Sequence, residues 1–328
     1  MIMSGRQVLL TGVGSHLPER VLSNDELATM MDTSDEWIRQ RTGIGQRHVA
    51  GENELTSDLA VAAARKALSS AGIDATSLDI IVIATTTPDD TFPATAAKVQ
   101  HQLGAARAFA FDVQAVCAGF VYALDIADSM IRCGKAERAL VIGAETFTRL
   151  LDWNDRSTAV LFGDGAGAVV LESAEHADGW GVLSSVLHTD GSQRDILYVD
   201  GGPSATGTVG HVRMRGQDVF RHAVEKLSSA LDEALQRAGL DASAIDWLVP
   251  HQANIRIIDS MQRKLKLPSE KVIRTVERHA NTSAASIPLA LAEGVADGRI
   301  SNGQILALEA IGGGLSWGAS VIRFGRPV

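Results

Sequence analysis

The chain contains little cysteine and few aromatic side chains: of its 328 residues, 2 are cysteines and 5% are Phe, Trp or Tyr. Two cysteines cannot build the disulfide framework of a secreted domain, so we expect both thiols to be reduced. No apolar run approaches the ~18 residues that a membrane helix needs, and the start, MIMSGRQVLLTGVG, lacks the features of a signal peptide. These absences predict a cytoplasmic protein without a membrane segment.

Positive charge is also scarce. The formal net charge is −9 and the pI is about 5.5, which excludes nucleic-acid binding by the molecule as a whole. An acidic partner would therefore need a local basic patch. Hydrophobic residues make up 45% of the chain and charged residues 21%, the balance of a globular protein with a large core. We expect two domains, or one large domain built from two similar halves.

The chain repeats itself at a spacing of about half its length. Residues 71–83 (AGIDATSLDIIVI) align without gaps to residues 238–250 (AGLDASAIDWLVP), with an offset of 167. Short β-branched runs alternate with alanine-rich helical stretches throughout, the pattern of α/β layers with buried sheets. We predict a duplicated α/β protein whose halves span 1–175 and 176–328.

Three polar side chains lie at the ends of these predicted elements. Cys117 follows AFAFDVQAV and opens a helical stretch, His251 follows the strand IDWLV, and Asn281 precedes the last long helix. Sites in open α/β sheets form beyond the carboxyl ends of strands, and the duplication should bring equivalent ends together. We interpret Cys117 as a nucleophile, His251 as a base or hydrogen-bond donor, and Asn281 as a second donor.

The position of Cys117 favours a reactive thiol. The thiolate is the nucleophilic form, and the start of a helix lowers a thiol pKa because its unpaired N–H groups favour negative charge. Ala118 and Gly119 would leave the sulfur accessible. Cys133 has no partner in view and is interpreted as inert. Three histidines without comparable surroundings are interpreted as structural: His211, His222 and His279.

Two glycine-rich stretches belong to the same predicted site. The run GGG at 312–314 follows the strand ILALEAI and is either a tight turn or a source of backbone N–H groups for an oxyanion hole. The stretch FGDGAGAVVL (162–171) lacks the glycine spacing of a dinucleotide-binding loop and the lysine of a P-loop. We interpret it as a turn and strand near the site.

A papain-like protease also carries Cys, His and Asn in this chain order, with the histidine about 130–150 residues downstream. The spacing of Cys117 and His251 in this chain falls within that range. The mid-chain cysteine, its small apolar neighbours and the duplicated α/β pattern argue against that alternative.

Taken together, the motifs resemble β-ketoacyl-acyl-carrier-protein synthase III, the family of initiating condensing enzymes of type II fatty-acid synthesis. The resemblance covers nearly the whole chain and rests on motifs in the family's order, namely TSDEWIRQRTGI (33–44), VCAGFVYAL, FGDGAGAVVL, VPHQANIRI, RHANTSAASIPLAL and GGGLSWG. It implies a thiolase-like fold of two duplicated α/β halves in five layers, α-β-α-β-α. It also implies that the enzyme needs no cofactor and no metal, since acyl-CoA is a substrate and CoA a product.

The resemblance implies a role for each residue of the predicted centre. Cys117 would attack a short acyl-CoA, acetyl-CoA first among them, and carry the acyl group. The N–H groups of Cys117 and Gly313 would hold the oxyanion. His251 Nε2 and the Asn281 amide would hold the enolate formed when malonyl-acyl-carrier protein loses CO2, since developing negative charge needs fixed donors.

The resemblance also implies three binding regions. Trp37 and Arg156 would flank the CoA adenine, with further contacts along the nucleotide and pantetheine from Arg41, Thr42, Gly216 and Asn254. The acidic carrier protein would dock on Arg256, Arg263 and Lys264, which share a helical face, with Arg221 and Gln252 beside them. The acyl pocket would involve Phe92, Phe147 and Ile311.

Phe92 matches a residue that the family inserts into a neighbouring subunit, which implies a homodimer. The chain departs from the family pattern at Ile311 and Leu315, where aromatic side chains are common. The main alternative is a thiolase-fold relative that condenses a different acyl donor in secondary metabolism. A thiolase proper would need a second cysteine near the C-terminal glycines, and the segment IGGGLSWG has none. A non-catalytic scaffold regulated through its thiol would leave Cys117 unacylated, with an ordinary thiol pKa.

Overall fold

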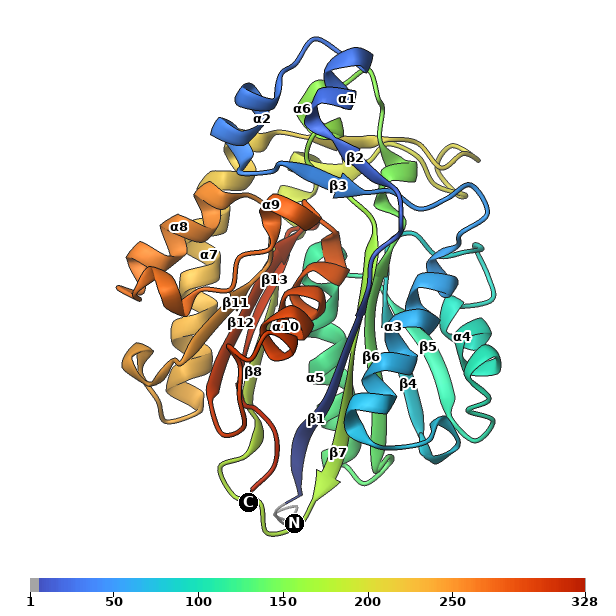
Figure 1. Ribbon diagram of the computed structural model, residues 1–328. Helices are drawn as coiled ribbons and strands as arrows, with labels where there is room; N and C mark the ends of the chain where they lie inside the picture. The colour runs from blue at the N-terminus through green and yellow to red at the C-terminus, as the bar shows by residue number, and fades with distance from the viewer. Residues whose placement is uncertain (1–5, 328) are drawn as a thin grey trace.

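The computed structural model describes residues 6–327 and contains two large β-sheets that enclose a pair of helices (Figure 1). The first sheet has the strand order β1-β7-β6-β4-β5 and the second has the order β11-β12-β13-β8. The strands of the first sheet are β1 Gln7–His16, β4 Ile80–Ala84, β5 Phe109–Val113, β6 Arg138–Glu145 and β7 Gly165–Ala174. Those of the second are β8 Gly181–Thr189, β11 Trp247–Pro250, β12 Ile305–Gly312 and β13 Ser316–Arg323.

Helices fill the space between the sheets and cover their outer faces. Helices α5 (Gly119–Arg132) and α10 (Ser286–Ala296) lie between the sheets and contact strands of both. Helices α3 (Thr56–Ala71) and α4 (Thr95–Leu103) cover the outer face of the first sheet, and α7 (Gly216–Arg237) with α8 (Ile255–Lys264) covers that of the second (Figure 1). The result is the five-layer α-β-α-β-α arrangement that the sequence predicted.

The internal repeat of the sequence is a repeat of structure with the same offset. Strand β4 begins at Ile80 and its counterpart β11 at Trp247, while β6 begins at Arg138 and β12 at Ile305. The central helices α5 and α10 begin at Gly119 and Ser286, which are separated by the same interval. The duplicated architecture is therefore confirmed, while the division of the chain at residue 175 stays a prediction.

Close packing of the central helix α10 depends on glycines in the first sheet. A Cβ at Gly143 of β6 would overlap the carbonyl oxygen of Ala284, and a Cβ at Gly167 of β7 would lie 2.6 Å from the backbone nitrogen of Leu289. The backbone that enters α10 can therefore lie directly on the sheet. That backbone carries Asn281, so these glycines set the depth of the site.

Smaller elements gather at one end of the molecule, at the top of Figure 1. They are β2 Val21–Ser23, α1 Asn24–Met30, α2 Asp35–Thr42, β3 Gln46–His48, α6 Arg156–Ala159, β9 Leu197–Val199, β10 Val212–Met214 and α9 Val276–His279. Short 3-10 turns connect the larger elements, and two of them, η2 Val116–Ala118 and η7 Ser283–Ala285, lead into the central helices. None of the helices within residues 6–327 is long and apolar enough to cross a membrane.

Candidate active site

Cys117 lies in the 3-10 turn η2, directly before α5 rather than in the first turn of the helix itself. The preceding residue, Val116, has φ 50°, a conformation that is strained for a β-branched residue and is typical of functional sites. Gly312 at the end of β12 lies against this turn, since a Cβ there would be 2.6 Å from the backbone nitrogen of Cys117. The second half of the chain therefore forms one wall of the cysteine site.

The expected low pKa of the Cys117 thiol is wrong for the free protein. Burial raises the pKa of this thiol to about 12, the nearby Ser283 hydroxyl lowers it in part, and the Glu145 carboxylate raises it further. A thiol that is 4% exposed loses most of the hydration that would stabilise its anion. The resting Cys117 side chain is therefore a neutral thiol, which would have to lose its proton in order to act as a nucleophile.

His251 follows β11 and is almost fully buried. Burial lowers the pKa of the ring to about 3, so the imidazole is neutral at physiological pH. Its Nδ1 lies 2.5 Å from the Ser286 hydroxyl oxygen, whereas no protein atom within residues 6–327 forms a hydrogen bond with Nε2. One ring nitrogen is thus held by the protein and the other is left for a ligand.

Asn281 is fixed by hydrogen bonds of its backbone and of its side-chain amide oxygen. Its N–H donates to the Leu161 carbonyl at 2.9 Å, and its own carbonyl accepts from Gly163 at 3.0 Å. The amide oxygen accepts from the Ser283 N–H at 2.9 Å, and the amide nitrogen has no hydrogen-bond partner among the described residues. Residues 161–163 belong to the glycine-rich turn before β7, which therefore lies at the site as the sequence predicted.

The two turns that lead into the central helices are related by the repeat and pack against each other. Val116 in η2 and Ser283 in η7 are equivalent positions of the repeat and share a left-handed backbone, with φ 50° and 49°. Ala280, directly before Asn281, has φ 58°. Such strained residues persist only where the surrounding structure holds them, so the backbone of both turns is held in place by the fold.

The backbone N–H groups of Cys117 and Gly313 belong to two turns that meet, since Gly312 lies against the Cys117 backbone nitrogen and Gly313 against Val116. No carbonyl oxygen in residues 6–327 accepts from the Cys117 or Gly313 N–H, and the Cys117 N–H faces its own sulfur, where it lowers the pKa of the thiol in part. Buried backbone donors are nearly always paired, so two without a carbonyl acceptor beside a cysteine suit the oxyanion hole that acyl transfer requires. Gly313 itself stays a prediction as the second donor.

Four of the predicted CoA residues are assembled in one small region. The Arg41 guanidinium carbon lies 4.4 Å and that of Arg156 5.0 Å from the centre of the Trp37 ring. Asn254, the N-cap of α8, donates to the Arg41 carbonyl at 3.1 Å. The sequence segments of α2, α6 and α8 are far apart in the chain, so the fold creates this aromatic and cationic cluster.

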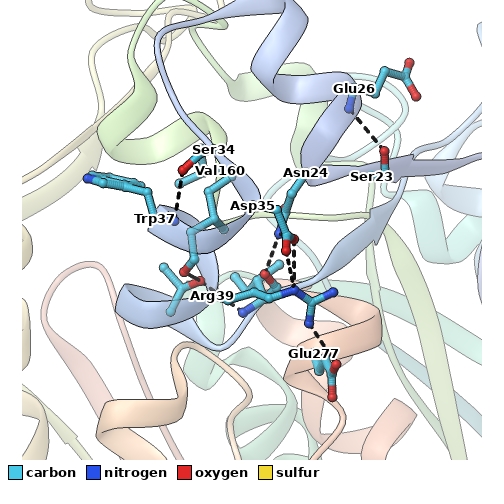
Figure 2. A network of polar contacts seen from close by, with 12 residues as sticks. Ser23, Asn24, Glu26, Ser34, Asp35, Trp37, Arg39, Val160 and Glu277 are labelled. Atoms are coloured by element: carbon cyan, nitrogen blue, oxygen red, sulfur yellow. Dashed lines mark hydrogen bonds and ion pairs between the residues drawn. The ribbon is translucent and has the colours of Figure 1, made fainter.

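Helix α2, which carries Trp37, is tied into a network of polar contacts (Figure 2). Arg39 Nε donates to both carboxylate oxygens of Asp35 at 2.8 and 2.9 Å, and its Nη1 donates to Glu277 of α9 at 2.9 Å. Asn24 donates to Asp35 at 2.8 Å, and its amide oxygen accepts from the fully buried Arg47 at 2.8 Å. The helix is therefore linked both to the buried interior and to the segment that precedes Asn281.

Thr42 stays a prediction as a CoA contact, and the structure shows what its side chain does within the chain. Its side chain is buried, donates to the Ile38 carbonyl at 2.7 Å and accepts from the Ile44 N–H at 3.0 Å. The hydroxyl thus closes the last turn of α2 and fixes the shape of the helix end. Gly216 is exposed at the first residue of α7.

Most of the predicted carrier-protein patch is exposed. Arg256, Arg263 and Lys264 lie on the outside of α8, and Arg221 of α7 is exposed but pairs with Asp218 at 2.9 Å. Gln252 is wrongly included, because it is fully buried. Its amide donates to the Pro250 and Ile273 carbonyls and accepts from the Thr275 and Val276 N–H groups.

The predicted pocket residues divide into two groups. Phe147 is buried and stacks on Phe162 with ring centres 4.3 Å apart, in the cluster that also contacts Val116 beside the cysteine. Ile311 and Leu315 are buried around the glycine turn. Phe92 is 84% exposed, so within one chain it lines no pocket.

Several site residues escaped the sequence analysis. Ser286 and Ser283 lie in the segment RHANTSAAS but were not distinguished there, since serines at a helix start commonly serve as caps. Gly312 was identified only as part of a glycine run. Their roles depend on contacts between the two halves, which no local pattern reveals.

Comparisons with known proteins agree with this geometry. The family model described as 3-oxoacyl-[acyl-carrier-protein (ACP)] synthase III matches residues 111–191, and the corresponding C-terminal model matches residues 235–324. A β-ketoacyl-[acyl-carrier-protein] synthase III of Erythrobacter litoralis is 62% identical over 316 residues, covering 96% of this chain and 98% of the relative.

Solved structures give the same result. The crystal structure of 3-oxoacyl-(acyl carrier protein) synthase III from Pseudomonas aeruginosa superimposes with a TM-score of 0.92 at 45% identity, covering 98% of this chain and 99% of the other. A priming β-ketosynthase of a polyketide biosynthetic pathway has a TM-score of 0.93 at 37% identity and covers 98% of both chains. The fold is thus thiolase-like, and the protease and scaffold alternatives are wrong. The protein is a condensing acyltransferase of fatty-acid biosynthesis, and the chain belongs to the 3-oxoacyl-[acyl-carrier-protein] synthase III family.

Proposed function

We propose that the enzyme condenses a short acyl-CoA, acetyl-CoA first among them, with malonyl-acyl-carrier protein to give a 3-oxoacyl-acyl-carrier protein, CO2 and CoA. The observation that carries this proposal is the pairing of a buried thiol with two sets of donors that have no carbonyl partner among the described residues. The backbone N–H groups of Cys117 and Gly313 form one set, and the free nitrogens of His251 and Asn281 form the other.

The first half-reaction is a thioester exchange. Cys117 Sγ attacks the carbonyl carbon of the acyl-CoA, and the developing oxyanion accepts from the Cys117 and Gly313 N–H groups. The carbon–sulfur bond to CoA then breaks, and the proton of the neutral Cys117 thiol ends on the CoA sulfur. No base is consumed, which suits a site where the thiol is protonated at rest.

The second half-reaction makes the carbon–carbon bond. The bond between the malonyl methylene and its carboxylate breaks, CO2 departs, and the enolate oxygen accepts from His251 Nε2 and Asn281 Nδ2. The methylene carbon then attacks the acyl-cysteine, and the Cys117 thiolate leaves and takes a proton from solvent. Removing one such donor typically costs about 10²–10³ in rate.

The surface features fit the two substrates. The Trp37 ring between Arg41 and Arg156 suits a nucleotide base and its phosphates, since guanidinium and indole planes stack on bases. Arg256, Arg263 and Lys264 offer positive charge to an acidic carrier protein on a molecule whose net charge is −9. Both surfaces include α8 or its N-cap, so the two substrates would approach the thiol from the same side.

We also propose that two copies associate through the first sheet. Strand β5 is its outermost strand and pairs only with β4 among the described residues, which leaves a row of unpaired backbone groups. Phe109 on this strand is 46% exposed, and Phe92 in the neighbouring loop is 84% exposed. A second copy would cover the strand edge and receive the Phe92 ring near its acyl pocket.

The mass of the intact protein after brief incubation with acetyl-CoA tests the proposal. We expect one acetyl adduct on the wild type, none on Cys117→Ser, and discharge of the adduct by malonyl-acyl-carrier protein. An adduct that malonyl-acyl-carrier protein cannot discharge would instead favour a relative with another acceptor, like the priming β-ketosynthase above. No adduct with any short acyl-CoA would overturn the proposal.

The two half-reactions can be separated by substitution. His251→Ala and Asn281→Ala should each acquire the acetyl adduct at close to the wild-type rate but lose malonyl decarboxylation by about 10²–10³. Loss of acylation together with decarboxylation would show that the roles are assigned wrongly.

A further inference from the structure

We propose that Ser286 is a positioning residue that fixes the tautomer of His251, so that the catalytic ring presents Nε2–H to the substrate. This inference rests on the proposed role of His251 as a donor to the enolate. It concerns a side chain that touches no substrate and acts only through the imidazole.

The His251 imidazole is neutral in its buried position. His251 is 5% exposed and has no carboxylate within hydrogen-bond distance among residues 6–327. A neutral imidazole carries one N–H group, which can be on either nitrogen, and the hydrogen bond at one nitrogen decides which. The direction of the bond at Nδ1 therefore determines whether Nε2 donates or accepts.

The direction of that bond is fixed by the acceptors around Ser286. Nδ1 lies 2.5 Å from Ser286 Oγ, and the Gln252 backbone N–H also donates to this oxygen, more weakly, at 3.3 Å. No acceptor other than Nδ1 lies within hydrogen-bond reach of the Ser286 hydroxyl among the described residues. The hydroxyl hydrogen thus points to Nδ1, which must be unprotonated, and the ring proton is on Nε2.

Both Ser286 and His251 are held rigidly. Ser286 is the first residue of the buried helix α10, whose N-terminal backbone lies on the first sheet. The His251 N–H donates to the Glu309 carbonyl at 2.8 Å, and the next residue, Gln252, is fully buried with both ends of its amide bonded. Neither residue can turn away, so the hydrogen bond sets the ring orientation as well as its proton.

This arrangement explains how one histidine can serve decarboxylation without interfering with acylation. With Nε2 protonated, the ring is a ready donor to an enolate oxygen but cannot remove the proton of the Cys117 thiol. In enzymes where a second residue fixes the tautomer of a catalytic histidine, exchanging that residue lowers turnover strongly while leaving the geometry intact. Ser286 would have the same kind of influence here, exerted through a neutral hydroxyl.

The direct test is nitrogen NMR of the full-length enzyme labelled with ¹⁵N-histidine, with the His251 signals assigned by their loss in His251→Gln. We expect the wild type to show the Nε2–H tautomer, with Nδ1 shifted as an unprotonated acceptor. A wild-type ring protonated on Nδ1 would overturn the inference without any Ser286 variant.

The kinetic test compares Ser286→Ala with Ser286→Thr, which keeps the hydroxyl, and Ser228→Ala, which removes a buried hydroxyl bonded only to the Glu225 carbonyl of α7. Ser286→Ala should lose malonyl decarboxylation by about 10- to 100-fold while acetyl transfer to Cys117 changes less than about twofold. Ser286→Thr should recover most of the rate, and Ser228→Ala should match the wild type.

The outcomes separate this inference from the proposed function. A wild type that is neither acylated nor able to decarboxylate malonyl-acyl-carrier protein would defeat the proposed function itself. A wild type that does both, with Ser286→Ala equally active in decarboxylation, would overturn only the role of Ser286. Equal loss of acylation and decarboxylation in Ser286→Ala would indicate general disruption and would likewise overturn it.

Discussion

At the scale of single residues, His251 and Asn281 each bond one polar side-chain atom to the protein and leave the other without a partner among the described residues. His251 uses Nδ1 internally and leaves Nε2 free, and Asn281 uses its amide oxygen and leaves its nitrogen free. This division turns both side chains into donors of fixed orientation, which is what stabilisation of an enolate requires. In the proposed mechanism His251 therefore serves as a donor to the enolate and not as a base for the thiol.

The Cys117 thiol should show the pH dependence of a neutral group. Because burial raises its pKa to about 12, the thiolate fraction grows tenfold for each pH unit throughout the neutral range. In a Cys133→Ser background, which removes the exposed thiol, we expect iodoacetamide alkylation of Cys117 to rise about tenfold per unit from pH 6 to 9. A plateau below pH 8 would show that the N–H groups of the turn outweigh burial.

A second residue-scale prediction concerns Glu309, a fully buried carboxyl whose oxygens have no partner in the described structure. Burial raises its pKa from 4.5 to about 8. Between these values the folded state binds a proton that the unfolded state has lost, so stability falls as pH rises. The limiting slope is about 1.4 kcal/mol per pH unit.

Thermal unfolding of Glu309→Gln checks this prediction. The amide keeps the shape of the side chain but cannot ionise. The difference in Tm between the variant and the wild type should therefore be several degrees more favourable to the variant at pH 8.5 than at pH 5.5. Glu52→Gln, at an exposed position, serves as the control and should show no such gain. Parallel pH profiles for Glu309→Gln and the wild type would contradict the assignment.

At the scale of elements, helix α2 joins the proposed CoA surface to the segments that carry His251 and Asn281. Arg39 contacts Glu277, which lies shortly before Asn281, and the Arg41 carbonyl accepts from Asn254, which lies shortly after His251. A side chain at Gly45 would collide with the guanidinium, since a Cβ there would lie 2.6 Å from Arg39 Nη2. The Arg39 side chain is therefore seated on the backbone that links α2 to β3.

Removing this link should loosen α2 without affecting the chemistry. Arg39 and Glu277 are both substantially exposed, so the pair is worth only about 0.2–1 kcal/mol. We expect Arg39→Ala to raise KM for acyl-CoA by about two- to fivefold with kcat unchanged. Arg138→Ala, which breaks a comparable pair with Glu172 on a remote strand, should leave both constants unchanged. A fall in kcat alone would place Arg39 in the chemistry instead.

The elements that sequence analysis predicted well are those specified by local patterns. The β-branched strands, the internal repeat and the strand-end positions of Cys117 and His251 all depend on periodicity or spacing along the chain. The errors arose where the outcome depends on neighbours from other segments. Gln252 looks like a surface polar residue in the sequence, yet it is buried because adjoining backbone supplies its hydrogen bonds.

The same reasoning accounts for the Cys117 pKa. A helix start favours the thiolate, and that local effect is readable from the sequence. Burial opposes it, and burial is produced by Gly312 and η7 from the other half of the chain. Whether the pKa of the Cys117 thiol is raised or lowered therefore depends on the packing of both halves around it.

At the scale of the whole molecule, the two sheets end differently. The first sheet has five strands and ends in β5, whereas the second has four and ends in β11. At the position beside β11 that corresponds to β5, the second sheet has a single isolated bridge between Leu248 and Val272. Two aromatic rings, Phe92 and Phe109, stand exposed at this unpaired edge. An exposed edge strand with apolar side chains invites pairing with another chain, and two copies that pair through this edge would form a closed dimer.

Light scattering over a range of concentrations tests the dimer and the role of Phe92 together. The wild type should have twice the single-chain mass of 34.7 kDa. Burial of a phenylalanine side chain stabilises an interface by about 1.5–3 kcal/mol, so Phe92→Glu should weaken association by at least about tenfold. Because the Phe92 ring would line the partner's acyl pocket, the same substitution should also raise KM for acyl-CoA. Val21→Glu, at an exposed apolar position on β2, should change neither property. A wild type at single-chain mass throughout would refute the dimer, whereas a Phe92→Glu dimer of normal strength and normal KM would leave the dimer intact and remove Phe92 from its interface.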